Sequence, residues 1–209
     1  MNAIQKISFA EVEKSAIEKY FLSINLRIDG LSFLIQDQEK KNIHLEAYEW
    51  LNVTDWEKSI ANTKSLIQNH DLLKLDFVKP LIFIQSVNSM LIPDSIFQEK
   101  RNALLYKQYF GIENHKLYSS SIKNMKLLFG VDNRLAEIVD KKWNSCRWNH
   151  LSHTFIENSI NESGTEQDVF LKIENAYFEV VAIKNHKVEA HNYFEFSSSE
   201  EFLFNLLSF

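Results

Sequence analysis

Glycine, proline and cysteine are scarce in this chain of 209 residues, and each shortage narrows the choice of function. The four glycines, Gly30, Gly111, Gly130 and Gly164, stand far apart. A P-loop or a GxGxxG loop needs several glycines within a few residues, so the sequence excludes both. The single cysteine, Cys146, cannot form a disulfide within the chain and suits a reducing compartment.

Long apolar runs and clusters of one charge are also missing. No stretch approaches the roughly 20 apolar residues of a membrane span, and the N-terminal residues lack the apolar block of a signal peptide. The net charge is −5, and basic residues gather only in pairs such as Lys40-Lys41, whereas a nucleic-acid surface needs a concentrated basic stripe. We therefore expect a cytoplasmic protein with no membrane span and no nucleic-acid partner.

Large apolar side chains, in contrast, are plentiful. Hydrophobic residues make up 45% of the chain, and 16 Phe, 7 Tyr and 4 Trp are among them. This balance is typical of an ordinary globular protein, and the length allows one large domain or two small ones.

The first part of the chain predicts a three-stranded meander and a helix. Apolar residues recur at alternate positions, which indicates half-buried strands over 21–28, 31–36 and 43–50. Asp29-Gly30 predicts a hairpin turn in which Gly30 supplies a positive φ. Thr54 to Glu57 match a capping box, which opens a helix to about residue 70.

Strand and helix alternate through the middle of the chain. The apolar run Leu81–Gln85 indicates a strand that is covered on both faces. A helix from Pro93 to Gly111, a strand within Leu117–Phe129 and a helix capped by Asp132 follow. The helix after Pro93 carries Ile96, Leu104, Leu105 and Tyr109. Residues 144–166 receive no assignment, and 161–167 form the best linker candidate.

The opening pattern returns near the end of the chain. Strands are predicted over 169–173, 177–183 and 188–196, and Ser198 to Glu201 form a second capping box. At one constant offset, Ile28 aligns with Ile173, Phe33 with Phe178 and Tyr48 with Tyr193. In this alignment Glu174-Asn175 takes the place of Asp29-Gly30. We interpret the pattern as a structural repeat.

Three antiparallel strands followed by helix, strand, helix, strand, helix is the order of a ribonuclease-H-like unit. Together with the repeat, it resembles the actin-like ATPase fold. Three stretches resemble an uncharacterised bacterial family assigned that fold: Phe21–Ile35, Asn192–Phe196 and Glu200–Leu203. We predict an α/β protein with a duplicated ribonuclease-H-like architecture and a mixed sheet in each lobe. Residues 1–160 form the first lobe and 161–209 the start of the second. Members of the family continue beyond the final helix, so we expect an incomplete second lobe of three strands and a helix.

The resemblance implies a site for ATP and Mg²⁺ between two lobes. Such a site needs a hairpin loop from each lobe, usually with Gly so that backbone N–H groups can approach the phosphates, and an acidic residue for Mg²⁺. Asp29 and Gly30 stand where the first phosphate loop would lie. Glu174-Asn175, the expected counterpart, contains no glycine.

Cys146, His150 and His153 form a C-x₃-H-x₂-H cluster with zinc-ligand spacing. A closed structural site needs a fourth ligand, and no second Cys/His cluster supplies one. Trp143 and Trp148 flank the cluster, as they would in a packed segment. A Cys–His nucleophile pair is another interpretation. We expect no metal and list these three residues as candidate ligands only.

The sequence favours a non-catalytic, actin-like scaffold or interaction protein that works without a cofactor. An incomplete second lobe would leave a sheet edge or apolar surface uncovered, which predicts a protein partner or self-association. The alternative is an ATP-binding protein or phosphotransferase of the actin-like superfamily that keeps Asp29 and Gly30 as a phosphate loop. A metal-dependent enzyme centred on His150 and His153 is a third possibility.

Overall fold

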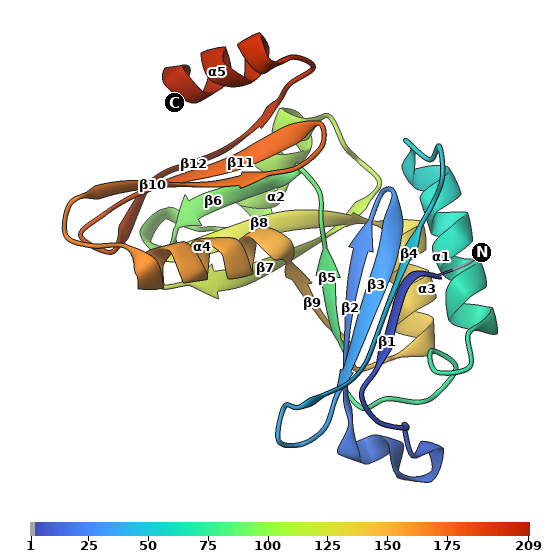
Figure 1. The fold of residues 1–209 in the computed structure, drawn as a ribbon. Helices are drawn as coiled ribbons and strands as arrows, with labels where there is room; N and C mark the ends of the chain where they lie inside the picture. The colour runs from blue at the N-terminus through green and yellow to red at the C-terminus, as the bar shows by residue number, and fades with distance from the viewer. Residues whose placement is uncertain (1–2) are drawn as a thin grey trace. The chain divides into compact units, whose positions relative to one another are not determined.

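The computed structural model describes residues 3–209, which fall into two compact units, Met1–Leu151 (unit 1) and Ser152–Phe209 (unit 2). The colour gradient of Figure 1 follows the chain through both units. The division expected after residue 160 falls within helix α4 (Leu151–Glu162). This helix, which the sequence left unassigned, therefore lies almost wholly in unit 2.

Unit 1 is built on a six-stranded mixed sheet in the order β1-β4-β3-β2-β5-β9. The four strands β1, β4, β3 and β2 are antiparallel to their neighbours, whereas β5 is parallel to both β2 and β9. The strands are β1 (Ala3–Ser8), β2 (Phe21–Arg27), β3 (Gly30–Gln36), β4 (Asn42–Glu49), β5 (Leu81–Ile84) and β9 (Arg147–His150). The meander β2–β4 and strand β5 confirm the predicted elements to within a residue or two.

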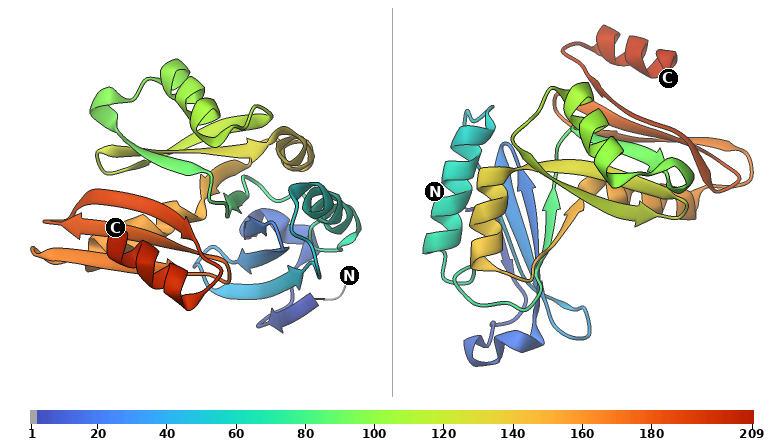
Figure 2. Two further views of the ribbon diagram at one scale, coloured as in Figure 1. Left: turned by 90° about the horizontal axis from the view of Figure 1, so that it is seen from above. Right: turned by 180° about the vertical axis from the view of Figure 1, so that it is seen from behind.

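Helices α1 (Trp56–Asn69) and α3 (Asn133–Lys142) cover one face of this sheet, as Figure 2 shows from behind. The alternate apolar residues of β2 and β3 point into the core beneath them. Asp55, not Thr54, caps α1 by accepting a hydrogen bond from the Lys58 N–H at 2.9 Å. Asp132 caps α3 as predicted, with the Arg134 N–H as donor at 2.9 Å.

A second, antiparallel sheet is inserted between β5 and α3. Its order is β6-β8-β7, formed by β6 (Ser89–Pro93), β7 (His115–Ile122) and β8 (Met125–Asp132). The single strand expected within Leu117–Phe129 is therefore wrong, because this stretch spans a hairpin. Its turn has the pair Ile122–Met125 on either side and a positive φ of 51° at Lys123, a residue type that carries no turn signal.

The helix predicted from Pro93 begins later and buries another face. A 3₁₀ turn (Asp94–Ile96) comes first, α2 runs over Glu99–Phe110, and Gly111 ends it in the left-handed conformation at φ 66°. Asn102 and Tyr106 are its buried residues, whereas the large apolar residues named from the sequence are exposed: Ile96, Leu104, Leu105 and Tyr109. The fully buried Tyr106 hydroxyl donates to the Asn88 carbonyl at 2.9 Å, which ties α2 to the loop after β5.

Unit 2 contains three antiparallel strands and a final helix, as the sequence predicted. Its sheet has the order β10-β11-β12, formed by β10 (Gln167–Ile173), β11 (Tyr177–Lys184) and β12 (Lys187–Glu195). Helix α5 (Ser199–Ser208) is capped by Ser198, whose hydroxyl accepts from the Glu201 N–H at 3.2 Å. The Phe202 ring lies 4.9 Å from that of the fully buried Phe178 and holds α5 against the sheet.

Helix α4 contacts the opposite side of this small sheet through polar groups. The Ser152 hydroxyl hydrogen-bonds the Tyr193 hydroxyl. Beside them the fully buried Glu179 accepts from His191 at 2.9 Å. No helix in residues 3–209 is long and apolar enough to cross a membrane.

A buried carboxylate on β4 ties the unit 1 sheet to the end of α1. Glu46 of β4 lies within 2.8 Å of both His44 Nε2 and the Tyr48 hydroxyl, and 3.2 Å from His70 Nε2. Burial alone would raise the pKa of Glu46, but the bonds from His44 and Tyr48 and the neighbouring His70 lower it. Burial also lowers the pKa of His70 by more than the nearby Glu46 raises it.

These two shifts predict that unit 1 loses stability in acid. As the pH falls below 6.5, the ordinary pKa of His70, the unfolded chain takes up the His70 proton before the folded chain does. The free energy of unfolding therefore decreases, and it decreases further below pH 4.5, where unfolded Glu46 is protonated first.

His70→Gln keeps a hydrogen-bond donor but removes the titration, so it should flatten the stability profile between about pH 6.5 and pH 5. Urea unfolding followed by tryptophan fluorescence measures this selectively, since Trp50, Trp56, Trp143 and Trp148 all lie in unit 1. Asn69→Gln is the matched control and should keep the slope of the parent protein. An equally steep slope in His70→Gln would contradict the assignment.

Candidate functional site

The turn between β2 and β3 is the predicted phosphate loop, and its own contacts account for its sequence. The closing pair is Arg27–Gly30, so the turn residues are Ile28 and Asp29, one position earlier than expected. The Asp29 carboxylate lies 3.1 Å from Arg27 Nε. The backbone carbonyl of Asp29 accepts a hydrogen bond from the Trp50 N–H at 2.7 Å. None of the three residues from 28 to 30 has a positive φ, so that expectation for Gly30 was wrong.

Gly30 is required by close packing between β3 and β4. A Cβ atom at this position would overlap the Tyr48 carbonyl oxygen and come within 2.9 Å of the Arg27 guanidinium. The glycine therefore allows two neighbouring strands to approach each other, and this role needs no ligand.

The corresponding turn of unit 2 also differs from its sequence alignment. Glu174 N–H donates to the Tyr177 carbonyl at 2.9 Å, so the two turn residues are Asn175 and Ala176. Superimposing the closing pairs of the two hairpins places Tyr177, not Asn175, at the position of Gly30. The predicted alignment was two residues out of register. The predicted lack of glycine in the second turn holds in the corrected register.

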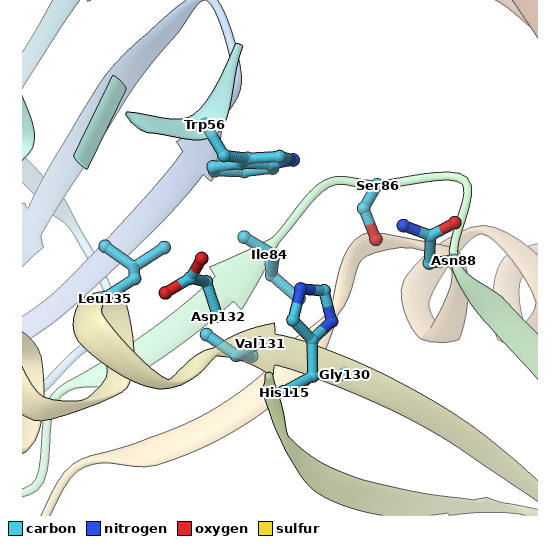
Figure 3. Close-up of a pocket in the computed structure, with 9 residues that line it drawn as sticks. All are labelled: Trp56, Ile84, Ser86, Asn88, His115, Gly130, Val131, Asp132 and Leu135. Atoms are coloured by element: carbon cyan, nitrogen blue, oxygen red, sulfur yellow. The ribbon is translucent and has the colours of Figure 1, made fainter. Parts of the chain in front are cut away.

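A pocket lies where the carboxyl end of β5 meets the inserted sheet (Figure 3). Ligands of open α/β sheets commonly bind outside the carboxyl ends of parallel strands. The loop after β5 brings Ser86 and Asn88, β7 brings His115, and β8 ends at Asp132. Trp56 at the start of α1 closes one side. With Ile84 of β5 and Leu135 of α3, the lining comes from five helices and strands and the loop after β5. Of its polar residues, sequence analysis singled out Asp132 alone, as a helix cap.

The pocket holds one imidazole, that of His115, and one carboxylate, that of Asp132. Burial lowers the pKa of His115 by more than Asp132 raises it, and its Nδ1 is buried with no hydrogen-bond partner among residues 3–209. The bidentate contact with Arg134 lowers the pKa of Asp132. The cavity measures about 10 Å³, the room that one water molecule needs. As it stands, the pocket has no room for a nucleotide.

Gly130 makes this pocket possible by the same device as Gly30. A Cβ on Gly130 would lie 2.6 Å from the Tyr106 hydroxyl and 2.7 Å from His115 Nδ1. Glycine thus lets α2 and β7 close over β8.

The three candidate metal ligands have separate environments. Cys146 Sγ donates to the Asp140 carboxylate at 3.3 Å. Burial, and to a smaller extent the neighbouring Asp140 carboxylate, raises the pKa of the thiol to about 12. His150 is buried 3.3 Å from the Ser86 hydroxyl, and His153 lies 3.2 Å from Glu157 within α4. Within residues 3–209 no three Cys, His, Asp or Glu side chains form a group that could hold a metal ion. A protonated thiol is also a poor nucleophile.

The β2-β3-β4 meander, the crossover helix and the parallel strands β5 and β9 define a ribonuclease-H-like unit, and the three-strand meander with a capped helix recurs in unit 2. The chain has the actin-like ATPase fold. A Bacteroides thetaiotaomicron protein with an actin-like ATPase fold and unknown function superimposes with a TM-score of 0.86. The two sequences are 22% identical, and the match covers 95% of this chain and 79% of that one.

Residues 10–209 match the profile of a family described as a protein of unknown function (DUF3822), and the chain belongs to this family. No curated protein matches it by sequence.

Other solved structures match with lower scores. The PilM–PilN type IV pilus biogenesis complex gives a TM-score of 0.48 at 10% identity, over 86% of this chain and 62% of that one. The cytoplasmic domain of EpsL, an inner membrane component of the type II secretion system of Vibrio cholerae, gives 0.42 at 11% identity, over 84% and 70%.

Gly30→Ala tests whether packing alone accounts for this glycine. We expect a loss of about 1–3 kcal/mol in the free energy of unfolding, because the added methyl group overlaps a backbone carbonyl that lies within a sheet. Gly164→Ala is the matched control, since its Cβ would meet no atom closer than 3.7 Å. Urea unfolding followed by circular dichroism compares the two variants. A Gly30→Ala variant as stable as Gly164→Ala would contradict the packing role.

Proposed function

We propose that this protein is a non-catalytic member of the actin-like fold that binds other proteins, as a scaffold or assembly partner. The observation that carries the proposal is an exposed apolar surface on unit 2. It comprises alternate residues of β10 and one face of α5: Val169, Leu171, Ile173, Leu203, Phe204 and Leu207, all of them at least 38% exposed.

The two faces of α5 explain why this surface calls for a partner. Phe202 packs on Phe178 and Phe196, so one side of the helix already covers the sheet. Leu207, on another side, is 86% exposed and Phe204 is 70% exposed. A helix that is apolar on more than one side is normally buried on more than one side. Large apolar side chains that gather in the solvent-exposed part of a small unit are typical of interaction sites.

The state of the predicted phosphate loop supports a role without catalysis. Gly30 serves the contact between β3 and β4, and the turn in unit 2 has Asn175 and Ala176 where a second glycine loop would lie. Backbone N–H groups can cradle a phosphate only where no side chain obstructs the approach.

ATP binding with Mg²⁺, with or without phosphotransfer, is the second candidate. Two observations favour it: the Asp29 carboxylate on the β2–β3 turn is partly exposed, and Asp132, whose pKa Arg134 lowers, lines the pocket beside the carboxyl end of β5. Either carboxylate has the chemistry to hold Mg²⁺.

Purified protein should neither hydrolyse ATP in the presence of Mg²⁺ nor shift its melting temperature at millimolar Mg·ATP. A ligand at about 100 times its Kd would stabilise the protein by about 2.7 kcal/mol, which a thermal scan detects readily. Hydrolysis that disappears in Asp29→Ala would overturn the proposal in favour of the second candidate. A thermal shift without hydrolysis that disappears in Asp29→Ala would establish nucleotide binding.

Partner capture should depend on the apolar face of α5. Leu207→Asp places a charge on that face at a position so exposed that the fold tolerates it. Ser208→Asp adds the same charge to the next residue, which is also exposed, and is the matched control. Co-purification from the native host, quantified by mass spectrometry, should lose specific partners with Leu207→Asp and keep them with Ser208→Asp. Equal capture by the two variants would count against this surface.

A further inference from the structure

A groove runs between helices α1 and α3, which lie side by side on one face of the unit 1 sheet (Figure 2). It encloses about 650 Å³. Its floor is apolar, because Ile67 of α1 is buried there and Ile138 of α3 is half-buried. The charged side chains that line it are five bases and one acid: Lys64, Lys74, Arg134, Lys141, Lys142 and Glu137.

The fold gathers these bases from distant parts of an acidic chain. They are spread over residues 64 to 142 of a protein whose net charge is −5. On α3, Arg134, Ile138 and Lys141 are four and three residues apart, so they share one face of the helix and extend over about 10 Å of its length. The opposite face of α3 is buried in the core. Folding thus creates a positive groove that the sequence does not show.

Ion pairs within unit 1 neutralise only part of this charge. Arg134 makes its bidentate contact with Asp132, and Lys142 lies 2.7 Å from Asp76. Lys74 approaches a carboxylate no closer than 3.9 Å, and that pair is exposed to solvent. Exposed pairs of this kind contribute little to stability.

Lys64 and Lys141 are the two bases without such a partner. Both are exposed, and among residues 3–209 neither forms an ion pair or a hydrogen bond through its side chain. The dipole of α3 favours Lys141 at the C-terminal end of that helix. No dipole favours Lys64, which lies in the middle of α1. The positive charge on the α1 side of the groove therefore has no role within unit 1.

We propose that this groove binds an acidic, amphipathic helix of a partner protein. Carboxylates of that helix meet Lys64 and Lys141, and its apolar stripe packs on Ile67 and Ile138. The inference rests on the proposed function as an interaction protein and names the chemical class of partner for a surface of unit 1. Helices pack with their axes about 8–10 Å apart, so a third helix fits over the seam between two neighbours. An amphipathic helix in a groove is also a recurrent mode of peptide recognition.

The apolar floor favours a polypeptide over a phosphate-bearing ligand. A nucleic acid would set its charged backbone against two isoleucine side chains and against the Glu137 carboxylate, which repels phosphate. A lipid headgroup layer is flat and cannot enter a concave groove. An acidic helix supplies both the apolar contacts and the opposite charge.

The test measures the fluorescence polarisation of a labelled peptide of about 16 residues, long enough to form a helix, with Glu on one face and Leu on the adjacent stripe. It should bind the full chain with a Kd of about 10–100 µM at low salt. The double variant Lys64→Glu, Lys141→Glu should bind it at least about tenfold more weakly. Lys100→Glu, Lys107→Glu is the matched control: it makes the same charge change at exposed residues of α2, outside the groove, and should keep the parent affinity.

Two further measurements separate a lost contact from a damaged fold. A second peptide, with Lys in place of every Glu, should bind the double variant at Lys64 and Lys141 more tightly than it binds the parent chain. Raising the salt concentration from about 0.05 to 0.5 M should weaken binding of the acidic peptide to the parent chain, because salt screens exposed charges. The second measurement needs no variant.

A parent chain that does not bind the acidic peptide at about 1 mM would overturn the inference. So would equal weakening in the control variant, or binding that salt leaves unchanged. Tighter binding of single-stranded DNA, or of phosphatidylserine vesicles, that is lost in the double variant at Lys64 and Lys141 would assign the groove to phosphates instead. Failure with the peptide removes only this inference, since the unit 2 surface is tested separately. ATP hydrolysis that is lost in Asp29→Ala removes the proposed function, whatever the peptide does.

Discussion

Unit 1 depends on the parallel pairing of β5 with β2 on one side and β9 on the other. The register sets Ile84 opposite both Leu26 and His150, and the Gln85 N–H continues the ladder by donating to the Leu26 carbonyl at 2.9 Å. Because the parallel strands β2, β5 and β9 end at the same level, the residues that follow them gather at the carboxyl ends of these strands. Ser86 meets His150 there, and the small pocket lies beside them. The chain enters the inserted sheet from this same end, because β6 follows the loop after β5.

The same architecture serves very different purposes in different proteins, so function must be argued from the site. Here the two positions where actin-like proteins would need open backbone are occupied. Gly30 faces the Tyr48 carbonyl, and Tyr177 takes the equivalent position in unit 2. The polar groups that do converge, His115 and Asp132, enclose room for a water molecule. In unit 2 the exposed apolar residues lie on β10 and α5 instead.

The elements that could be predicted from sequence are those whose signals are local. Alternating apolar residues identified the meander and the last three strands, a continuous apolar run identified β5, and a capping side chain identified α3. β9 could not be predicted, because the four residues Arg147–His150 contain a single large apolar side chain and owe their conformation to pairing with β5. The hairpin at Lys123 lacked a glycine or asparagine at its positive φ. For the candidate site, the turn around Asp29 was located to within a residue. The pocket could not be located, because its lining comes from five elements that only the tertiary fold brings together.

The polar cluster around Glu46 determines where the smallest stable form of unit 1 can begin. The family profile starts at residue 10, after β1. Yet Ser8 lies 2.7 Å from His44 Nδ1, and the Lys6 ammonium lies 3.5 Å from the buried Glu46 carboxylate. A recombinant fragment trimmed to the family boundary would lose both contacts and expose the edge of β4, with its row of unpaired backbone groups. Strand β1 lies outside the family match, but it covers the backbone groups of β4 that would otherwise be exposed. Fragments for expression or crystallisation should therefore retain it.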